Sequence, residues 1–190
     1  MEKDYLVIDF EYTQYRKSVG RPRGFFSEII EIGAVKICKD SHNIIGKIEN
    51  FVKPYFYPKQ AKEIMEFCSI TDEDMKKAIS FEDMLVKITE LYVPKKTWLV
   101  AWGKDDYKIL NTCCQRHNIP NPILQEDYFD LAKTCRIIKK LEKTPGLVKT
   151  AREMEISEDG HWHAAYEDAL KAAKILIKLL EDGHKLPATK

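Results

Sequence analysis

Two carboxylates stand two residues apart near the start of the chain, at Asp9 and Glu11. The run from Tyr5 to Glu11 is mostly apolar and predicts a central β-strand, on which side chains two residues apart project from the same face. Carboxylates embedded in such a strand are costly unless a positive group meets them. A divalent cation is a natural partner, because Mg²⁺ and Mn²⁺ prefer carboxylate oxygens. The alternative is a strand end that emerges into solvent.

A third candidate metal ligand, Asp106, is selected by helical periodicity. Helix neighbours at three, four and seven positions beyond it form an apolar face, which consists of Ile109, Leu110 and Cys113. The adjacent Asp105 is rotated by about 100° and is typical of an acid at a helix start, where the macrodipole favours it. Asp106 is therefore predicted to point inward. An ordinary acid of the first helical turn is the alternative.

The same test separates Asp168 from Glu167. Asp168 shares its helical face with apolar side chains, namely Ala172, Ile175, Leu176 and Leu179. Glu167 shares its face with lysines, namely Lys171, Lys174 and Lys178, which predicts a solvated face with supportive charge spacing. Asp168 is therefore predicted to be the inward acid and a fourth candidate ligand.

A histidine precedes this acid by five residues. His163 stands at the predicted start of the helix, and an imidazole there could serve as a general base near neutral pH. A helix cap or a core histidine is the alternative. Zinc is disfavoured, because the chain has no H-E-x-x-H and no nearby cysteine that would complete a tetrahedral set with His161 and His163.

The elements that must position these residues follow from hydrophobic patterning. Strands are expected at 5–11, 29–38, 44–52, 98–101 and 128–131. Helices are expected at 59–67, 72–78, 81–92, 104–117, 131–142, 146–155 and 163–182. Three consecutive strands followed by alternating helices and strands predict an α/β protein with a mixed sheet flanked by helices. We expect one domain at residues 1–183 and a C-terminal tail at 184–190.

Composition is ordinary for a soluble globular protein, with 44% hydrophobic and 32% charged residues among 190. The N-terminus lacks an apolar signal region, and no apolar run approaches membrane-spanning length, so we predict a cytoplasmic protein without a membrane partner. The five cysteines lack C-x-x-C spacing and are expected to be small buried apolar groups.

The net charge of +1 indicates that the protein does not grip a long duplex backbone. It is compatible with a short strand end held at a metal site. A basic segment, between Tyr12 and Gly24, carries Arg16, Lys17, Arg21 and Arg23. Both a solvated loop and a flap that touches phosphates fit this composition.

Taken together, these motifs resemble those of the DEDDh exonucleases, which have the ribonuclease H-like fold. Asp9-Phe10-Glu11 is similar to the first motif of the family, and Trp102-Gly-Lys-Asp-Asp106 is similar to the second. His163-Ala-Ala-Tyr-Glu-Asp168 matches the third motif, H-x4-D. The similarity extends over nearly the whole chain, through stretches that include Glu28–Val35, Phe51–Pro54 and Gly146-Leu147. The subgroup it resembles most comprises the KapD-type proteins and the enzymes that trim histone mRNA and small RNAs.

The resemblance implies a five-stranded sheet and a 3′→5′ exonuclease that releases nucleoside 5′-monophosphates from a single-stranded 3′ end, with RNA favoured over DNA. It implies two Mg²⁺ or Mn²⁺ ions bound by four carboxylates, those of Asp9, Glu11, Asp106 and Asp168. One ion would be bound mainly by Asp9 with Glu11 and Asp168, and the other by Asp9 with fewer protein contacts. Glu11 is counted with His163 in the catalytic set, and His163 would be the general base.

Contacts to the terminal base or sugar are expected from residues beside the ligands, namely Phe10, Tyr12, Trp102 and His163. For Phe10 and Trp102, packing in the core is the alternative. Three other functions remain open on the sequence. They are a DNA-directed proofreading or repair exonuclease, a catalytically idle RNA-binding regulator of the same fold, and a hydrolase of small phosphodiesters. An intact acid set disfavours the idle regulator, because clustered carboxylates repel phosphate without metal. Protein partners are not indicated.

Overall fold

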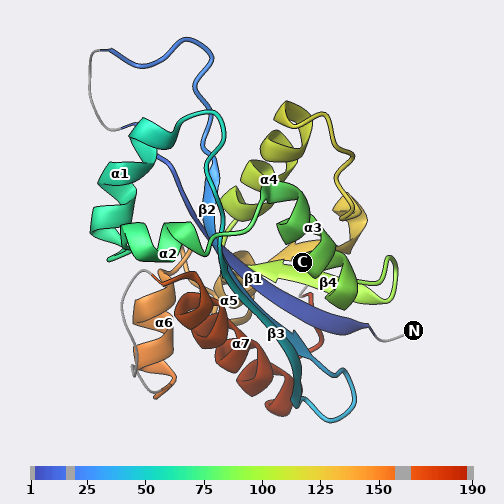
Figure 1. Ribbon diagram of the computed structural model, residues 1–190. Coiled ribbons are helices and arrows are strands. Elements are labelled where there is room, and N and C mark those ends of the chain that lie inside the picture. The colour runs from blue at the N-terminus through green and yellow to red at the C-terminus, as the bar shows by residue number, and fades with distance from the viewer. Residues whose placement is uncertain (1–2, 16–19, 157–163, 188–190) are drawn as a thin grey trace.

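The computed structural model describes residues 3–15, 20–156 and 164–187 of the chain. Its centre is a mixed sheet, as the sequence predicts, and the strand order is β3-β2-β1-β4-β5 (Figure 1). The strands β1, β2 and β3 pair antiparallel, whereas β1, β4 and β5 pair parallel. Their bounds are β1 (Asp4–Tyr12), β2 (Ile29–Ile37), β3 (Ile44–Phe51), β4 (Thr97–Ala101) and β5 (Tyr128–Asp130).

Each predicted helix within the described residues is present. The helices are α1 (Pro58–Phe67), α2 (Asp72–Lys76), α3 (Phe81–Leu91), α4 (Asp105–Arg116), α5 (Leu131–Ile138), α6 (Leu147–Glu153) and α7 (Ala165–Glu181), with a short 3-10 turn η1 (Gln125–Asp127). The expectation that the fifth of them extends to residue 142 was wrong. It ends at Ile138 because Lys140 adopts a φ of 52° and the Leu141 N–H bonds back to the Arg136 carbonyl, which closes the helix.

Two apolar layers enclose the sheet, and alternation along β1 decides which residues enter each layer. Leu6, Ile8 and Phe10 pack on the face covered by α3 and α4. Tyr5 and Val7 pack on the opposite face, which α5, α6 and α7 cover (Figure 1). Because side chains alternate along a strand, the odd-numbered residues of β1 face α7. Asp9 and Glu11 therefore belong to the α7 face.

The close approach of α7 to β2 depends on a glycine. A Cβ atom built on Gly33 would lie 2.1 Å from the Ala165 carbonyl carbon and 2.1 Å from the Tyr166 nitrogen. No side chain fits there unless the helix backbone moves. Gly33 pairs with Asp9 in the β1–β2 register, so this contact sets the position of the α7 N-terminus beside Asp9.

We expect Gly33→Ala to lower the free energy of unfolding by about 3 kcal/mol or more, because the methyl group must displace helix backbone. Urea unfolding monitored by circular dichroism would measure the loss. Gly146→Ala is the matched control, since nothing lies within 4 Å of the added Cβ and its φ is −74°. A loss at Gly33 no larger than the loss at Gly146 would contradict the close packing.

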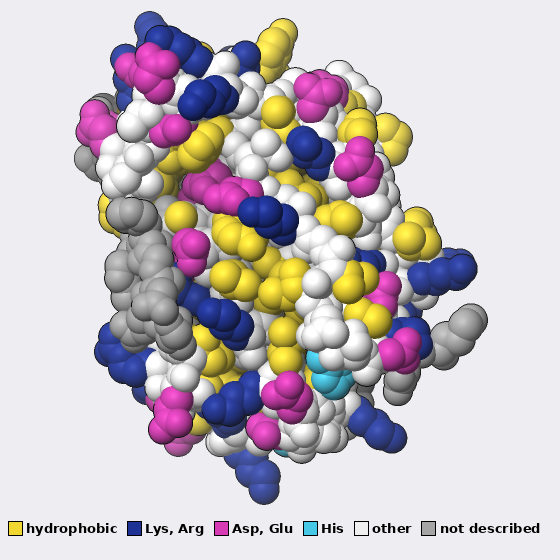
Figure 2. Space-filling view, turned by 60° about the horizontal axis from the view of Figure 1, so that its bottom comes forward, with side chains coloured by type: hydrophobic (Ala, Val, Ile, Leu, Met, Phe, Trp, Pro, Cys, Tyr) yellow, Lys and Arg dark blue, Asp and Glu magenta, His cyan; other side chains and the backbone are white. Residues whose placement is uncertain are grey.

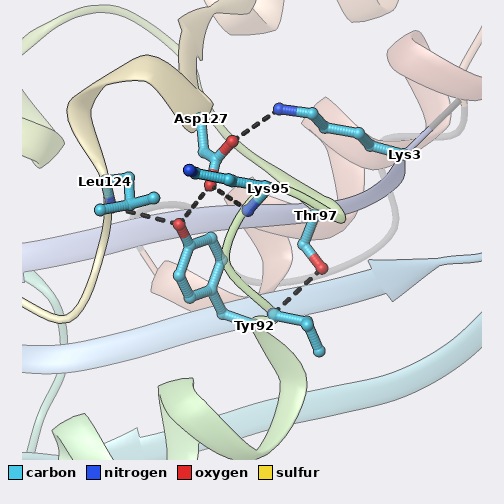
Figure 3. Close-up of polar contacts among 7 residues, drawn as sticks. Lys3, Tyr92, Lys95, Thr97, Leu124 and Asp127 are labelled. Atoms are coloured by element: carbon cyan, nitrogen blue, oxygen red, sulfur yellow. Dashed lines mark hydrogen bonds and ion pairs between the residues drawn. The ribbon is translucent and has the colours of Figure 1, made fainter. Parts of the chain in front are cut away.

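The end of the sheet where β1 begins is held by a buried carboxylate (Figure 3). Asp127 is fully buried and accepts hydrogen bonds from Lys3 Nζ at 2.6 Å, the Tyr92 hydroxyl at 2.5 Å and the Lys95 N–H at 2.7 Å. Burial raises the pKa of Asp127, but the hydrogen bonds from Lys3 and Tyr92 outweigh it and hold that pKa below its usual value. This carboxylate is therefore charged and fully satisfied.

The surface carries charged side chains of both signs, interspersed around a strip of apolar groups on the face shown in Figure 2. The described helices include none that is both long and apolar enough to cross a membrane. The prediction that the cysteines are buried is confirmed for Cys68, Cys113, Cys114 and Cys135, whereas Cys38 is only half-buried.

Candidate functional site

The carboxylates of β1 meet that of Asp168 at the carboxyl end of the strand. One carboxylate oxygen from each of Asp9, Glu11 and Asp168 lies within 4.8 Å of the others. β1 supplies the first two on its α7 face, and the first turn of α7 supplies the third. Residues 159 positions apart in the sequence are thus brought within the range of a single coordinated cation.

Asp106 joins this group from the first turn of α4, as helical periodicity predicts. It is 7% exposed, whereas the neighbouring Asp105 is exposed to solvent. Its Oδ1 accepts a hydrogen bond from the Phe10 N–H at 3.2 Å, which fixes the carboxylate against β1 between the positions of Asp9 and Glu11. Gly103, at a φ of 110°, makes the turn that leads from β4 into α4.

The lysine-lined face that the sequence predicts for α7 is only partly solvated, which corrects our expectation for Lys171. Its side chain is 5% exposed, and its Nζ lies 3.0 Å from Asp168 Oδ1. Long side chains on a helix point back toward the N-terminus, so a lysine three residues after Asp168 can return to it over the preceding turn. The site therefore contains a buried ammonium group as well as carboxylates.

A further carboxylate at the site, Glu31, was missed. It lies opposite Glu11 in the β1–β2 register, is buried, and accepts a hydrogen bond from the Ala165 N–H at the start of α7. The available signal was an acid inside a mostly apolar strand. The side chain satisfies a backbone N–H at the helix N-terminus, where a negative charge is favourable.

Burial and mutual repulsion make the ionised site unfavourable. The pKa of Asp9 is raised well above its usual value, first by burial and then by the charges of Asp106, Asp168 and Glu11. Burial, the largest cause in each case, raises the pKa of Glu11 to about 7 and that of Asp106 to about 7. A divalent cation would offset both causes. The oxygen-only donor set and its spacing therefore fit a hard divalent metal ion.

In EDTA, ionisation of the site carboxylates is expected to lower the free energy of unfolding as pH rises. An acid with a raised folded-state pKa contributes most stability below its unfolded pKa and loses that contribution as pH rises through its folded pKa. For Glu11 this window runs from pH 4.5 to about pH 7, and the free energy of unfolding lost across it is at most about 3 kcal/mol. The melting temperature of Glu11→Gln relative to the unmodified protein should increase across this window. A constant difference would contradict the raised pKa, and saturating Mn²⁺ should remove the increase.

The residues expected to touch the terminal nucleotide lie in different settings. Phe10 is 3% exposed and packs in the core, which favours core packing over nucleotide contact for its side chain. Its backbone N–H donates to Asp106. Trp102 is half-buried, packs beside the α7 layer and donates from Nε1 to the Pro145 carbonyl at 3.2 Å. Tyr12 is half-buried at the end of β1, and burial raises the pKa of its hydroxyl to about 12. His163 lies outside the described residues.

Comparison with known proteins adds a family match to this geometry. The exonuclease family profile, RNase_T, matches residues 6–176. A probable 3′-5′ exonuclease, KapD, from Bacillus subtilis is 35% identical over 176 residues, which cover 93% of this chain and 83% of that protein. 3′-5′ exoribonuclease 1 from Rattus norvegicus is 27% identical over 196 residues, and this chain spans about half of its length, 55%.

The fold is shared with solved nucleases. The nuclease domain of 3′hExo, described as a DEDDh family member bound to rAMP, superposes with a TM-score of 0.84 at 24% identity, and the match covers 100% of this chain and 97% of that domain. The similarity confirms the expected ribonuclease H-like architecture, a mixed five-stranded sheet with helices on both faces.

Proposed function

Because this chain belongs to the exonuclease family, we propose that it is a 3′→5′ exonuclease that removes single nucleotides from the 3′ end of single-stranded RNA. The observation that carries the proposal is the gathering of Asp9, Glu11 and Asp168 within 4.8 Å, with Asp106 held beside them. A phosphodiesterase that uses metal ions needs such a cluster, whereas a protein that only binds RNA has no use for clustered carboxylates that repel phosphate. The geometry therefore disfavours an idle regulator.

The carboxylates would hold two Mg²⁺ or Mn²⁺ ions, which when bound polarise the scissile phosphate and stabilise the developing charge on the leaving oxygen. Contacts within the chain would hold the proposed ligands in place. The Phe10 N–H orients Asp106, and the contact of Gly33 with the α7 backbone fixes Asp168 opposite Asp9. Lys171 orients Asp168 by occupying one of its two oxygens, so the other oxygen is the one available to a cation.

His163 is proposed as the general base that accepts a proton from the attacking water. It precedes α7 by two residues and Asp168 by five, so it is tied in sequence to the helix start that Gly33 and Glu31 position. The ordinary pKa of histidine suits proton transfer near neutral pH. Tyr12, at the end of β1 just beyond Glu11, remains a candidate for contact with the terminal sugar or base, and Trp102 is a second candidate.

RNA is proposed over DNA because the exoribonuclease 1 relative is named for RNA, although the KapD name specifies no nucleic acid. Discrimination depends on contacts to the 2′-hydroxyl, which RNA has and DNA lacks. We also keep the proposals that residues 1–183 form the catalytic domain, with 184–190 as a tail, and that the protein acts in the cytoplasm.

The test is hydrolysis of 5′-labelled single-stranded RNA and DNA of matched sequence in Mg²⁺, Mn²⁺ or EDTA. The expected result is a ladder that shortens from the 3′ end only with metal, with nucleoside 5′-monophosphates as products. A 3′-phosphate should slow the ladder, and Asp9→Asn should abolish it. Internal cleavage, shortening from the 5′ end, or equal rates in EDTA would each refute the proposed function. Equal rates on RNA and DNA would refute only the sugar preference.

A further inference from the structure

A continuous row of aromatic rings leads away from the end of β1. It starts three residues after Tyr12 and ends between α3 and α4. Neighbouring ring centroids in this row are between 4.4 and 5.9 Å apart. In order, the members of this aromatic row are Tyr15, Phe25, Tyr57, Phe26, Phe56, His117 and Phe81.

The far end of the aromatic row opens into a groove of about 740 Å³, which we call the upstream groove. Its walls are the segment 53–56, the start of α3 and the end of α4. The wall residues that matter for binding are Lys53, Tyr55, Phe56, Arg116 and His117. None of them belongs to the carboxylate site described above.

Tyr55 is displayed to solvent on a fixed backbone. The residue is 76% exposed, so its ring is accessible to a binding partner. The backbone N–H groups of Tyr55, Phe56 and Tyr57 all donate to the buried carboxylate of Glu28, at 2.7, 2.8 and 2.5 Å. Glu28 in turn exchanges hydrogen bonds with Thr13, which directly follows β1. The backbone that carries the exposed ring is therefore held by hydrogen bonds to Glu28.

Two arginine side chains lie over rings of the aromatic row. The Arg116 guanidinium lies over the Phe26 ring at 5.1 Å, and the Arg21 guanidinium lies over the Phe25 ring at 5.3 Å. Lys53 is exposed at the groove wall, and Glu82 is the acid there, 3.3 Å from His117 Nδ1. Tyr55 and Phe56 are the exposed rings here, whereas Phe26 and Phe81 are buried. Proteins bind single-stranded nucleic acid with exposed rings next to arginine and lysine, so that bases stack on the rings and phosphates contact the cations.

The helix α4 connects this surface to the carboxylate site. Asp106 lies in its first turn and Arg116 is its last residue. Ten residues of α-helix span about 15 Å, which equals roughly four nucleotides stacked at about 3.4 Å each. A strand whose 3′ end lies at the carboxylates could thus reach the groove within a few nucleotides.

We propose that the upstream groove binds a nucleotide several positions from the 3′ end, with its base against Tyr55 and its phosphate on Arg116 and Lys53. This inference rests on the proposed function, since it assigns a second contact to the same strand. It gives the enzyme a preference for strands long enough to reach both places. Dinucleotides would bind at the carboxylate site alone.

The test compares KM and kcat on single-stranded RNAs of two to twelve nucleotides. For the unmodified protein, KM should fall once the strand exceeds about four nucleotides. Tyr55→Ala and Arg116→Gln should each raise KM for the 12-mer about tenfold, the scale expected for loss of one stacked base or one phosphate contact. Both variants should leave kcat, and the KM of the dinucleotide, unchanged.

Two control variants match these changes on other surfaces. Phe67→Ala removes another exposed aromatic side chain, at the end of α1, and Lys149→Gln removes an exposed cation on α6. Both should keep the length dependence. A KM that is independent of length, a length dependence that survives both groove variants, or an equal rise in KM for the dinucleotide would each overturn the groove assignment. Such results leave the exonuclease activity standing, whereas absence of hydrolysis at every length refutes the proposed function instead.

Discussion

Asp9→Asn is expected to lower the rate of nucleotide release by at least about 10³-fold while raising the melting temperature of the metal-free protein. The rate falls because Asp9 is the carboxylate that interacts with all the other acids of the site, and metal assistance contributes several kcal/mol to such reactions. The stability rises because the amide has nearly the same shape but carries no charge that burial and neighbouring acids disfavour. Single-turnover hydrolysis and thermal melts in EDTA at pH 7.5 measure the two effects.

Asp105→Asn is the matched control for this prediction. It is an acid of similar local sequence at the start of α4, but it is exposed. We expect little change in rate or in melting temperature. If Asp9→Asn destabilised the metal-free protein as much as a disrupted core would, the account of Asp9 as an unfavourable buried charge would be wrong. A retained rate would remove Asp9 from the metal site.

His163→Ala is expected to lower kcat by about 10² to 10⁴-fold, the usual contribution of a general base. KM should stay within a small factor, because the imidazole is proposed to act mainly in proton transfer and other residues share the contact with the terminal nucleotide. The rise in melting temperature on adding Mn²⁺ should also persist, because the carboxylates remain. The variant should lose the limb of the pH–rate profile that reports deprotonation of the base. Stopped-time hydrolysis from pH 5.5 to 8.5 would show this.

The neighbouring His161 provides the comparison for His163. His161→Ala removes an imidazole from the same segment and should leave kcat near that of the unmodified protein. If the two variants were equally slow, the loss would reflect the segment rather than a specific base. If His163→Ala kept its full rate at saturating metal, the base assignment would be wrong.

Periodicity predicted the direction of a side chain correctly where one helix or strand decides it. It separated Asp106 from Asp105, because the buried face of α4 is defined by its own apolar residues. The mixed sheet followed in the same way from three strands before the first helix. The same method failed for Lys171, because α7 is buried over a wider arc than its apolar residues indicate and the lysine returns to Asp168.

Hydrophobic patterning could not predict contacts between segments that are distant in the sequence. Glu28 directly precedes β2, and Glu31 lies within it. Glu28 accepts hydrogen bonds from backbone N–H groups at the start of α1, and Glu31 accepts one at the start of α7. Nothing in the local sequence says which helix start will lie next to which acid. The prediction that α5 extends to residue 142 failed for a local reason. Lys140 adopts the left-handed backbone conformation that ends the helix, a position where glycine is the usual signal.

A carboxylate charge is stabilised at one end of β1 and destabilised at the other, so amide hydrogen exchange should differ between the two ends. At Asp127 the charge is matched by three donors near Lys3, whereas at Asp9 it is opposed by other acids. Without metal, transient opening of the sheet should therefore begin near residue 9 and reach residue 4 last, so that protection decreases along a single strand. The enzyme would be most deformable where it must admit a strand and most rigid at the opposite end.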